Sequence, residues 1–435
     1  MKQSTVPLFP VAVSLIAGIV IGLSFSSHLF LLPIAIALAI TTVLSLLLGR
    51  HRLLQTTSLM CCVVLFGLLL TANRLKELEQ EAANKPCSER IYPNSAWNGN
   101  RGEYVSSRPS LSLLDHARNV FLGWRQQLLK RYRLLGARDD SYAVMAAMTL
   151  GDKSALDRDL RDVYSITGAS HVLALSGLHL GILYMLLSRL TLSHRRRRVW
   201  SQVLLVCAVW AFVMLVGMPV SVVRSAFMIT IFALFSLGHR PNMSVNLLSL
   251  TVIILLVIDP LTILDVGFQL SFMAVLSILV CPFLRSDDWQ RNITVVGNTE
   301  VFHYPTVKER ATKVLQQCLL VSVAAQLGVA PLIAFYFGRF PTWFLLTNLI
   351  VLPAAYVILA GTLIMMVIPA ASIIVIAATS LLNRLLTLMT QLPLASIDGL
   401  HPSVAEVVLV YVCIALFYVF SHQCQVALIK RERPY

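Results

Sequence analysis

The sequence predicts an all-α polytopic membrane protein with about twelve transmembrane helices, some short or broken, and with amphipathic helices at the membrane interface. Hydrophobic residues make up 57% of the 435 residues and charged residues only 13%, whereas a soluble domain carries roughly a quarter of its residues as charged ones. The apolar residues come in runs of about 20, the length that crosses a bilayer. Most of the eight cysteines lie inside these runs and no C-x-x-C pair occurs, which excludes a secreted disulfide scaffold and gives no zinc-binding pattern.

Each long apolar run is interpreted as one spanning helix. The twelve expected spans are Val6 to Phe25, His28 to Leu48, Leu53 to Ala72, His171 to Leu190, Val199 to Val216, Val220 to Leu237, Met243 to Ile258, Ile263 to Leu284, Val314 to Phe337, Thr342 to Ile368, Ala371 to Leu392 and Val407 to Ile429. They divide the chain into three parts. We expect an N-terminal membrane segment of three helices at 1–73, an extracytoplasmic polar segment with a basic amphipathic helix at 74–138, and a membrane domain at 139–435.

Basic loop residues predict the orientation, because Lys and Arg collect on the cytoplasmic side of a membrane protein. With twelve spans and a cytoplasmic N-terminus, each of the four basic clusters falls on the cytoplasmic side. These clusters are Arg50 to Arg52, Arg195 to Arg198, His239 with Arg240, and Lys430 to Arg433. Both termini are therefore expected in the cytoplasm. The first apolar run lacks a clear cleavage site and is expected to remain as a helix.

One basic segment disagrees with that orientation, because the span count places it outside. Its cations are Arg125, Lys130, Arg131, Arg133 and Arg138, with no acidic residue among them, and apolar residues share its helical periodicity. Three interpretations stay open. The segment is an interfacial helix bound to anionic lipid headgroups, a basic collar at an outer entrance for a polyanion, or a sign of a miscounted span.

A segment from Gly168 to Gly181 opens a predicted span yet contains polar side chains. On a continuous helix Ser176 and His179 would share one face, with His171 two turns earlier. Polar groups at membrane depth usually face the bundle interior or a wet cavity. The alternatives are hydrogen bonds that only stabilise the helices, a Ser-His hydrolase without a visible oxyanion site, and a metal site without a carboxylate ligand. Gly177 and Gly181 form a G-x-x-x-G pattern that favours close helix packing.

Other polar groups lie inside later spans. Arg224 could bind a phosphate through its two-pronged guanidinium, or pair with Asp259 or Asp265. Gln269, Ser271 and Gln326 could line a pore or bond helix to helix. Prolines at 331 and 353 are expected to interrupt two spans, which is typical of transport sites. No G-x-x-x-x-G-K-[ST] phosphate loop and no H-x-H-x-D-H cluster occurs, so no ATP motor or metallo-hydrolase domain, and no cofactor, is expected.

The chain resembles the ComEC family of competence proteins. The resemblance depends on the segments Gly168 to His179, Pro219 to Arg224 and Asp259 to Phe272, in this order and spacing, and it spans about Asp139 to Arg433. Two features depart from the family. The polar stretch from Asn73 to Arg118 is too short for the OB-like domain, and no metallo-β-lactamase-like domain precedes Tyr435.

The resemblance implies a bacterial inner-membrane channel, without catalytic residues or cofactors, that passes single-stranded DNA into the cytoplasm. It implies an ATP-driven cytoplasmic motor, an extracytoplasmic DNA receptor and membrane lipids as partners, and it leaves open a separate nuclease and a homodimer. A secondary transporter for an anionic solute is the alternative function. The residues expected to line or shape the DNA path are His171, Ser176, Gly177, His179, Arg224, Gln269, Ser271 and Gln326, with Arg125, Lys130, Arg131 and Arg133 as the outer basic collar.

Overall fold

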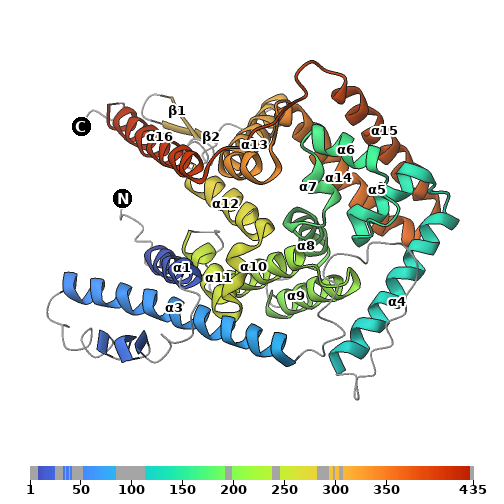
Figure 1. Ribbon diagram of the computed structural model, residues 1–435. Coiled ribbons are helices and arrows are strands. Elements are labelled where there is room, and N and C mark those ends of the chain that lie inside the picture. Colours follow the sequence, from blue (N-terminus) through green and yellow to red (C-terminus); the bar gives the residue numbers. More distant parts are fainter. Residues whose placement is uncertain are drawn as a thin grey trace. The chain divides into compact units, whose positions relative to one another are not determined.

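The computed structural model describes residues 8–24, 33–34, 36–38, 40–41, 52–84, 113–191, 198–237, 245–281, 293–296, 299–302 and 307–431. The chain forms two compact units (Figure 1). The first contains Met1–Ala117 and Ser244–Asp265, and the second contains Arg118–Met243 and Val266–Tyr435. The segment from Ser244 to Asp265, which the sequence analysis placed with the C-terminal membrane domain, is thus grouped with the N-terminal helices.

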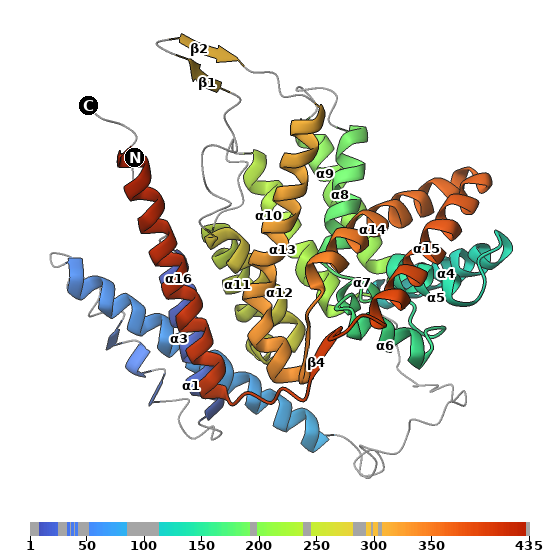
Figure 2. The same cartoon turned by 90° about the horizontal axis from the view of Figure 1, so that it is seen from above.

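The first unit consists of the helices α1 (Leu8–Ser24), α3 (Arg52–Asn84) and α11 (Val245–Ile258) and the 3-10 helix η4 (Pro260–Leu264). The helices α1 and α3 pack along each other (Figure 2). A Cβ atom at Gly18 would lie 2.1 Å from the carbonyl oxygen of Val64, so only glycine allows this approach of the two backbones. The backbone N–H of Leu8 donates to Asn246 Oδ1 at 3.3 Å and links α1 to α11.

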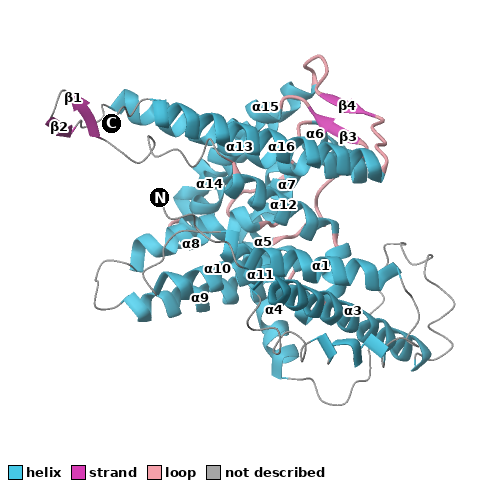
Figure 3. Cartoon of the chain, turned by 90° about the vertical axis from the view of Figure 1, so that its left-hand side faces the viewer, coloured by secondary structure: helices cyan, strands magenta, loops and turns pink. Residues whose placement is uncertain are grey.

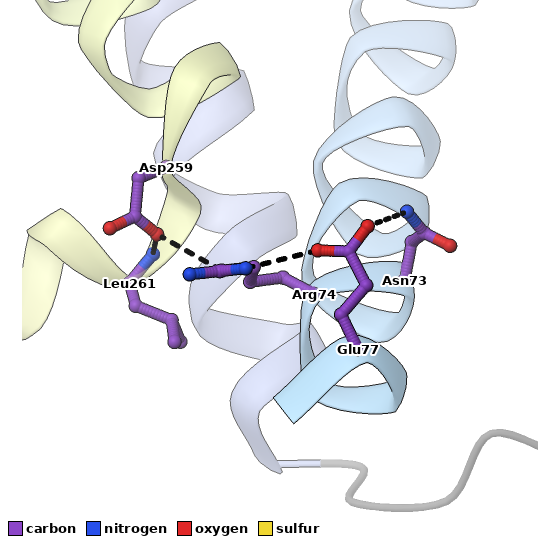
Figure 4. A network of polar contacts seen from close by, with 5 residues as sticks. All are labelled: Asn73, Arg74, Glu77, Asp259 and Leu261. Atoms are coloured by element: carbon purple, nitrogen blue, oxygen red, sulfur yellow. Dashed lines mark hydrogen bonds and ion pairs between the residues drawn. The ribbon is translucent and has the colours of Figure 1, made fainter. Parts of the chain in front are cut away.

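Polar contacts connect the end of α3 to the turn after α11 (Figure 4). The guanidinium of Arg74 lies between two carboxylates, at 3.0 Å from Glu77 and 3.8 Å from Asp259. Asp259 also accepts from the backbone N–H of Leu261 at 3.1 Å and so caps η4. This explains the Asp259-Pro260 pair locally, because an N-cap carboxylate followed by proline is a favourable helix start.

The second unit is larger and almost entirely helical. Its elements are α4 (Leu113–Leu134) from Arg118 on, α5 (Asp139–Leu150), α6 (Arg158–Ile166), α7 (Ser170–Leu173), α8 (Gly177–Thr191), α9 (Arg198–Leu215), α10 (Val220–Leu237), α12 (Val266–Val280), β1 (Ile293–Val296), β2 (Thr299–Phe302), α13 (Val307–Phe337), β3 (Arg339–Pro341), α14 (Phe344–Val367), η7 (Pro369–Ala371), α15 (Ser372–Thr390), β4 (Ser396–Asp398) and α16 (Val404–Arg431).

The main core of this unit joins α5, α6 and α7 to α14 and α15. The helix α5 is apolar all round and is buried from Tyr142 to Leu150, as a helix without a polar face must be. Tyr164 on α6 donates from its hydroxyl to Asn383 Oδ1 on α15 at 2.7 Å, and both side chains are buried. Burial raises the pKa of the Tyr164 phenol above its usual value, so the hydroxyl keeps its proton.

The predicted class of helical membrane protein is supported, but the count of twelve spans is not confirmed. Among the described residues, five helices are long and apolar enough to cross a bilayer, namely Gln55–Gln80, Ala311–Phe337, Phe344–Val367, Pro369–Thr390 and Val404–Ser421. Five shorter apolar helices are Leu8–Ser24, Val199–Leu215, Val220–Phe235, Val245–Ile258 and Val266–Val280. The expected span from His28 to Leu48 lies largely outside the described residues.

Two details of the prediction are wrong. The expected span from His171 to Leu190 is divided into α7 and α8. The helices α13 and α14 continue through Pro331 and Pro353, which therefore do not interrupt them. Two short antiparallel strand pairs also occur (Figure 3). β1 and β2 form a hairpin with Ile293 opposite Phe302, and β3 pairs with the distant β4, with Arg339 opposite Asp398.

Candidate functional site

A break between α7 and α8 lies at the centre of the segment that the sequence analysis singled out. Residues 174–176 are not helical, and α8 begins at Gly177. The backbone N–H of Ser176 donates to His179 Nδ1 at 3.3 Å, and Ser176 Oγ lies 3.2 Å from the same nitrogen. Ser176 and His179 thus meet as expected, but through a helix start rather than along a continuous helix. A Ser-Gly pair is a common helix beginning, since serine favours the cap position.

The break is fixed by two serines on α10. Ser221 Oγ donates to the carbonyl oxygen of Leu175 at 2.9 Å. A Cβ atom at Gly177 would lie 2.8 Å from Ser225 Oγ, so the start of α8 approaches α10 closely. Gly181 has no neighbour within 4 Å of its Cβ position, so the close packing expected from the G-x-x-x-G pattern holds for Gly177 and not for Gly181.

Arg224 connects the same turn of α10 to α12. Its side chain is buried, with 4% of its surface exposed, and its guanidinium carbon lies 5.7 Å from the ring centre of Phe268. Phe268 is in turn stacked with Phe272, with ring centres 6.2 Å apart. A cation at this distance over an aromatic face is attracted by the ring. Through Ser221, Ser225 and Arg224, α10 therefore contacts Leu175 and Gly177 of the first segment and Phe268 of the third segment on which the resemblance depends.

His179 is the most enclosed of the predicted site residues. Its side chain has no exposed surface, and its Nε2 atom has no hydrogen-bond partner among the described residues. Because Nδ1 accepts from the Ser176 N–H, the ring proton of a neutral His179 lies on Nε2. A buried donor without an acceptor costs about 1–3 kcal/mol. A Ser-His hydrolase would need an acidic side chain hydrogen-bonded to His179 Nε2 to orient the base, and the described residues supply none.

The remaining path candidates make other contacts. His171 is exposed, and its Nδ1 lies 2.9 Å from the carbonyl oxygen of Gly168. Gln269 accepts from the Tyr336 hydroxyl at 2.8 Å, which is a bond between α12 and α13. Ser271 lies half-buried on α12. Gln326 lies half-buried on α13, with Nε2 buried and without a hydrogen-bond partner in the described part of the chain.

The predicted outer collar lies on α4, and three of its four cations are exposed. Arg125 lies in the packing beside Gly217, with its NH1 atom 3.7 Å from the glycine's Cβ position. Arg133 is exposed and lies over the Tyr142 ring at 4.6 Å. Lys130, Arg131 and Arg133 are therefore available to an anionic partner, whether lipid or nucleic acid.

Sequence reasoning assigned no role to Ser221 and Ser225, which contact the break between α7 and α8, or to Tyr336, which joins Gln269 to α13. A signal for the first two exists. They stand four residues apart on α10, so they occupy one helix face and can contact one neighbouring helix. The partner of that face is set by the tertiary fold and could not be found from spacing.

The profile of the competence protein family matches residues 148–423, which is most of the chain and includes all the segments that converge here. The chain belongs to the competence protein family. This family membership agrees with the resemblance found in the sequence. Together with the long apolar helices, it identifies a membrane protein of the competence type.

Individual relatives are more distant. The chain is 27% identical over 273 residues to ComE operon protein 3 of Bacillus subtilis (strain 168), which is 62% of this chain and 31% of that protein. It is 30% identical over 239 residues to an uncharacterized protein of Aquifex aeolicus (strain VF5), covering 54% of this chain and 50% of that one. It is 27% identical over 186 residues to competence protein ComA of Neisseria gonorrhoeae, covering 40% and 27%. The chain thus spans half or less of these relatives, and no solved structure matches it.

Proposed function

We propose that this protein takes part in DNA uptake during natural transformation and forms the membrane passage for a single DNA strand. The observation that carries the proposal is the convergence of the three competence segments at one turn of α10, where Arg224 is buried among apolar helices. A charge inside a membrane helix costs about 2.5–3.5 kcal/mol on insertion scales, and such residues usually have a function. The name of one relative, competence protein ComA, gives competence as its biological context.

The chemistry of the cluster suits a phosphate backbone. A strand carries one negative charge per nucleotide, and a passage must replace the water around each phosphate with donors. Arg224 offers a guanidinium that binds phosphate through two parallel N–H groups, and His179 offers its Nε2–H. The face of Phe268 below Arg224 offers a surface on which a base can stack without sequence preference.

The conformation described here is the closed one under this proposal. Arg224 is 4% exposed and His179 is fully buried, so a strand reaches them only after the helices separate. The non-helical residues 174–176 provide the place for such a movement, since a hydrogen bond from Ser221 Oγ to the Leu175 carbonyl joins them to α10. Separation of α8 from α10 would expose the buried Nε2–H of His179 at the same time as it opens the passage.

The partners follow from the same proposal. Three exposed cations of α4, Lys130, Arg131 and Arg133, form an outer basic surface that an arriving strand or anionic lipids would meet. Movement in one direction requires work, which an ATP-driven cytoplasmic motor would supply after an extracytoplasmic receptor delivers the DNA. The protein would lie in the bacterial inner membrane with both termini in the cytoplasm. A separate nuclease would degrade the other strand, and a homodimer is compatible with this arrangement.

Transformation of a naturally competent host tests the proposal. The gene is deleted and complemented with wild type, Arg224→Gln, Arg224→Lys or the control Arg189→Gln, which removes an exposed arginine from α8. We expect the deletion to abolish uptake of a marked DNA fragment. Arg224→Gln should lower it at least tenfold, and Arg224→Lys should lower it less. The Arg189→Gln strain should transform like wild type. Unchanged transformation in the deletion strain would overturn the proposal.

The divided helix α7–α8 also favours a second candidate, a secondary transporter for an anionic solute, because broken helices and a buried cation are common at such sites. Vesicles that contain the purified protein distinguish the two functions. Oligonucleotide that becomes protected inside the vesicles supports the DNA passage. Gradient-driven accumulation of a small anion, with no protection of oligonucleotide, supports the transporter.

A further inference from the structure

A long apolar groove lies between α13 and α16, with the end of α12 at its base. Its volume is about 670 Å³. Apolar side chains of both helices line it, among them Leu320, Val323, Leu327, Val410, Cys413 and Phe417. We call this feature the α13–α16 groove. It belongs to the second unit and is separate from the cluster around Arg224.

Two tyrosines hold the helix α16 at a distance from its neighbours. Tyr411 donates from its hydroxyl to the carbonyl oxygen of Gly328 at 2.8 Å. Ser277 Oγ donates to the carbonyl oxygen of Ala324 at 2.6 Å, which uses its only proton, so the Tyr418 hydroxyl is the donor in its 3.0 Å bond to Ser277 Oγ. Tyr411 and Tyr418 stand two turns apart on one side of α16. Their long side chains fix the helix at two points and leave the apolar space beside them.

The chemistry of the groove excludes a polar occupant. The hydroxyl protons of both tyrosines are already donated, and the lining otherwise consists of hydrocarbon, aromatic and thiol groups. Both walls are helices that can span a bilayer, Ala311–Phe337 and Val404–Ser421. At the depth of such helices, acyl chains rather than water are available to fill an apolar space.

We propose that the α13–α16 groove is a lipid site that holds the acyl chain of one phospholipid. A second copy of the chain is a poorer occupant, because helices associate in membranes through small residues that let the backbones approach. The exposed residues of α16 at the groove are large, with Leu409 63% and Phe417 50% exposed. A flexible chain fits an irregular slot of this kind without such an approach.

The opposite face of α16 provides a control. Val412 is 49% exposed and does not line the groove, whereas Val410 is 44% exposed and does. The two valines have nearly equal exposure on one helix but face different surroundings. The neighbour of Val412, Cys413, is an exposed groove residue whose enlargement would fill the slot.

Native mass spectrometry of the full chain tests the proposal. The protein is reconstituted with dioleoyl phosphatidylcholine and released in a mild detergent. We expect one retained phosphatidylcholine on wild type and on Val412→Phe, and at least a fivefold loss of this adduct on Cys413→Phe. Equal retention on both variants, a lipid-free monomer in wild type, or a dimer that Cys413→Phe disperses would each overturn the proposal.

Fluorescence quenching keeps the test decisive if Cys413→Phe does not fold. Tryptophan is placed at 410 or at 412, and its fluorescence is measured in bilayers with rising fractions of phosphatidylcholine brominated on its acyl chains. For Val410→Trp we expect the fluorescence to depend on the brominated fraction as it would for a single lipid next to the tryptophan. For Val412→Trp we expect the dependence given by several lipids that exchange with the bilayer. The same curve for both variants, or no quenching at 410, contradicts a resident chain.

Discussion

Gly328 is the position where the structure makes its sharpest prediction about packing. A Cβ atom there would lie 2.5 Å from the carbonyl oxygen of Met273 and 2.7 Å from Ser277 Cβ, both on α12. Neither atom can rotate away, so Gly328→Ala must push α12 and α13 apart. An overpacked core costs about 1–3 kcal/mol. The shift also weakens the bond from Ser277 to the Ala324 carbonyl, at about 1 kcal/mol. We therefore expect a loss of about 2–4 kcal/mol.

Gly181→Ala is the matched control, because Gly181 also lies inside a helix but has nothing within 4 Å of its Cβ position. There alanine should stabilise by about 0.5–1 kcal/mol through its better helix propensity. The assay is SDS-induced unfolding of the purified protein in mixed micelles. Transformation frequency should fall with Gly328→Ala, since α12 carries Phe268 and Gln269. A Gly328→Ala protein as stable as Gly181→Ala would refute the close approach of α12 and α13.

Three further changes are predicted. Tyr164→Phe removes the donor to buried Asn383 and should cost about 1–3 kcal/mol in the same unfolding assay. Burial raises the pKa of the Tyr164 phenol. The stability that the hydroxyl contributes should therefore be full below about pH 10 and decline only at higher pH. Ser221→Ala removes the bond to the Leu175 carbonyl and should cost about 1 kcal/mol, with altered DNA uptake if residues 174–176 move during transport. Glu77→Gln should change stability by less than about 1 kcal/mol, because its ion pair is half-exposed; a larger loss would mean that the first unit depends on this network.

The apolar runs made most of the helices predictable. Five expected spans correspond to helices of spanning length and five to shorter apolar helices, because hydrophobic length is a local property of the sequence. The segment around Ser176 was identified for the same reason, since two histidines and a serine are unusual in such a run. Its contact with His179 was expected, but the helix break that produces it was not.

Long-range packing could not be predicted from one sequence. Nothing in the run from Val245 to Ile258 indicates that it belongs with α1 and α3 rather than with the helices beside it in the chain. The prolines at 331 and 353 suggested breaks, yet both helices continue through them, and membrane helices in general tolerate proline. The role of Arg224 depends on Phe268, which is distant in sequence and comes close only in the fold.

A DNA strand that passes the turn of α10 carrying Arg224 can be trapped there in transit. Phe268, whose ring lies against Arg224, is replaced by a photo-reactive phenylalanine analogue, and the control places the same analogue at the exposed Phe420 of α16. Competent cells take up labelled DNA and are illuminated during transport. We expect a cross-link to the entering strand from position 268 and none from position 420. Efficient uptake without any cross-link at 268 would contradict passage of the strand beside Arg224.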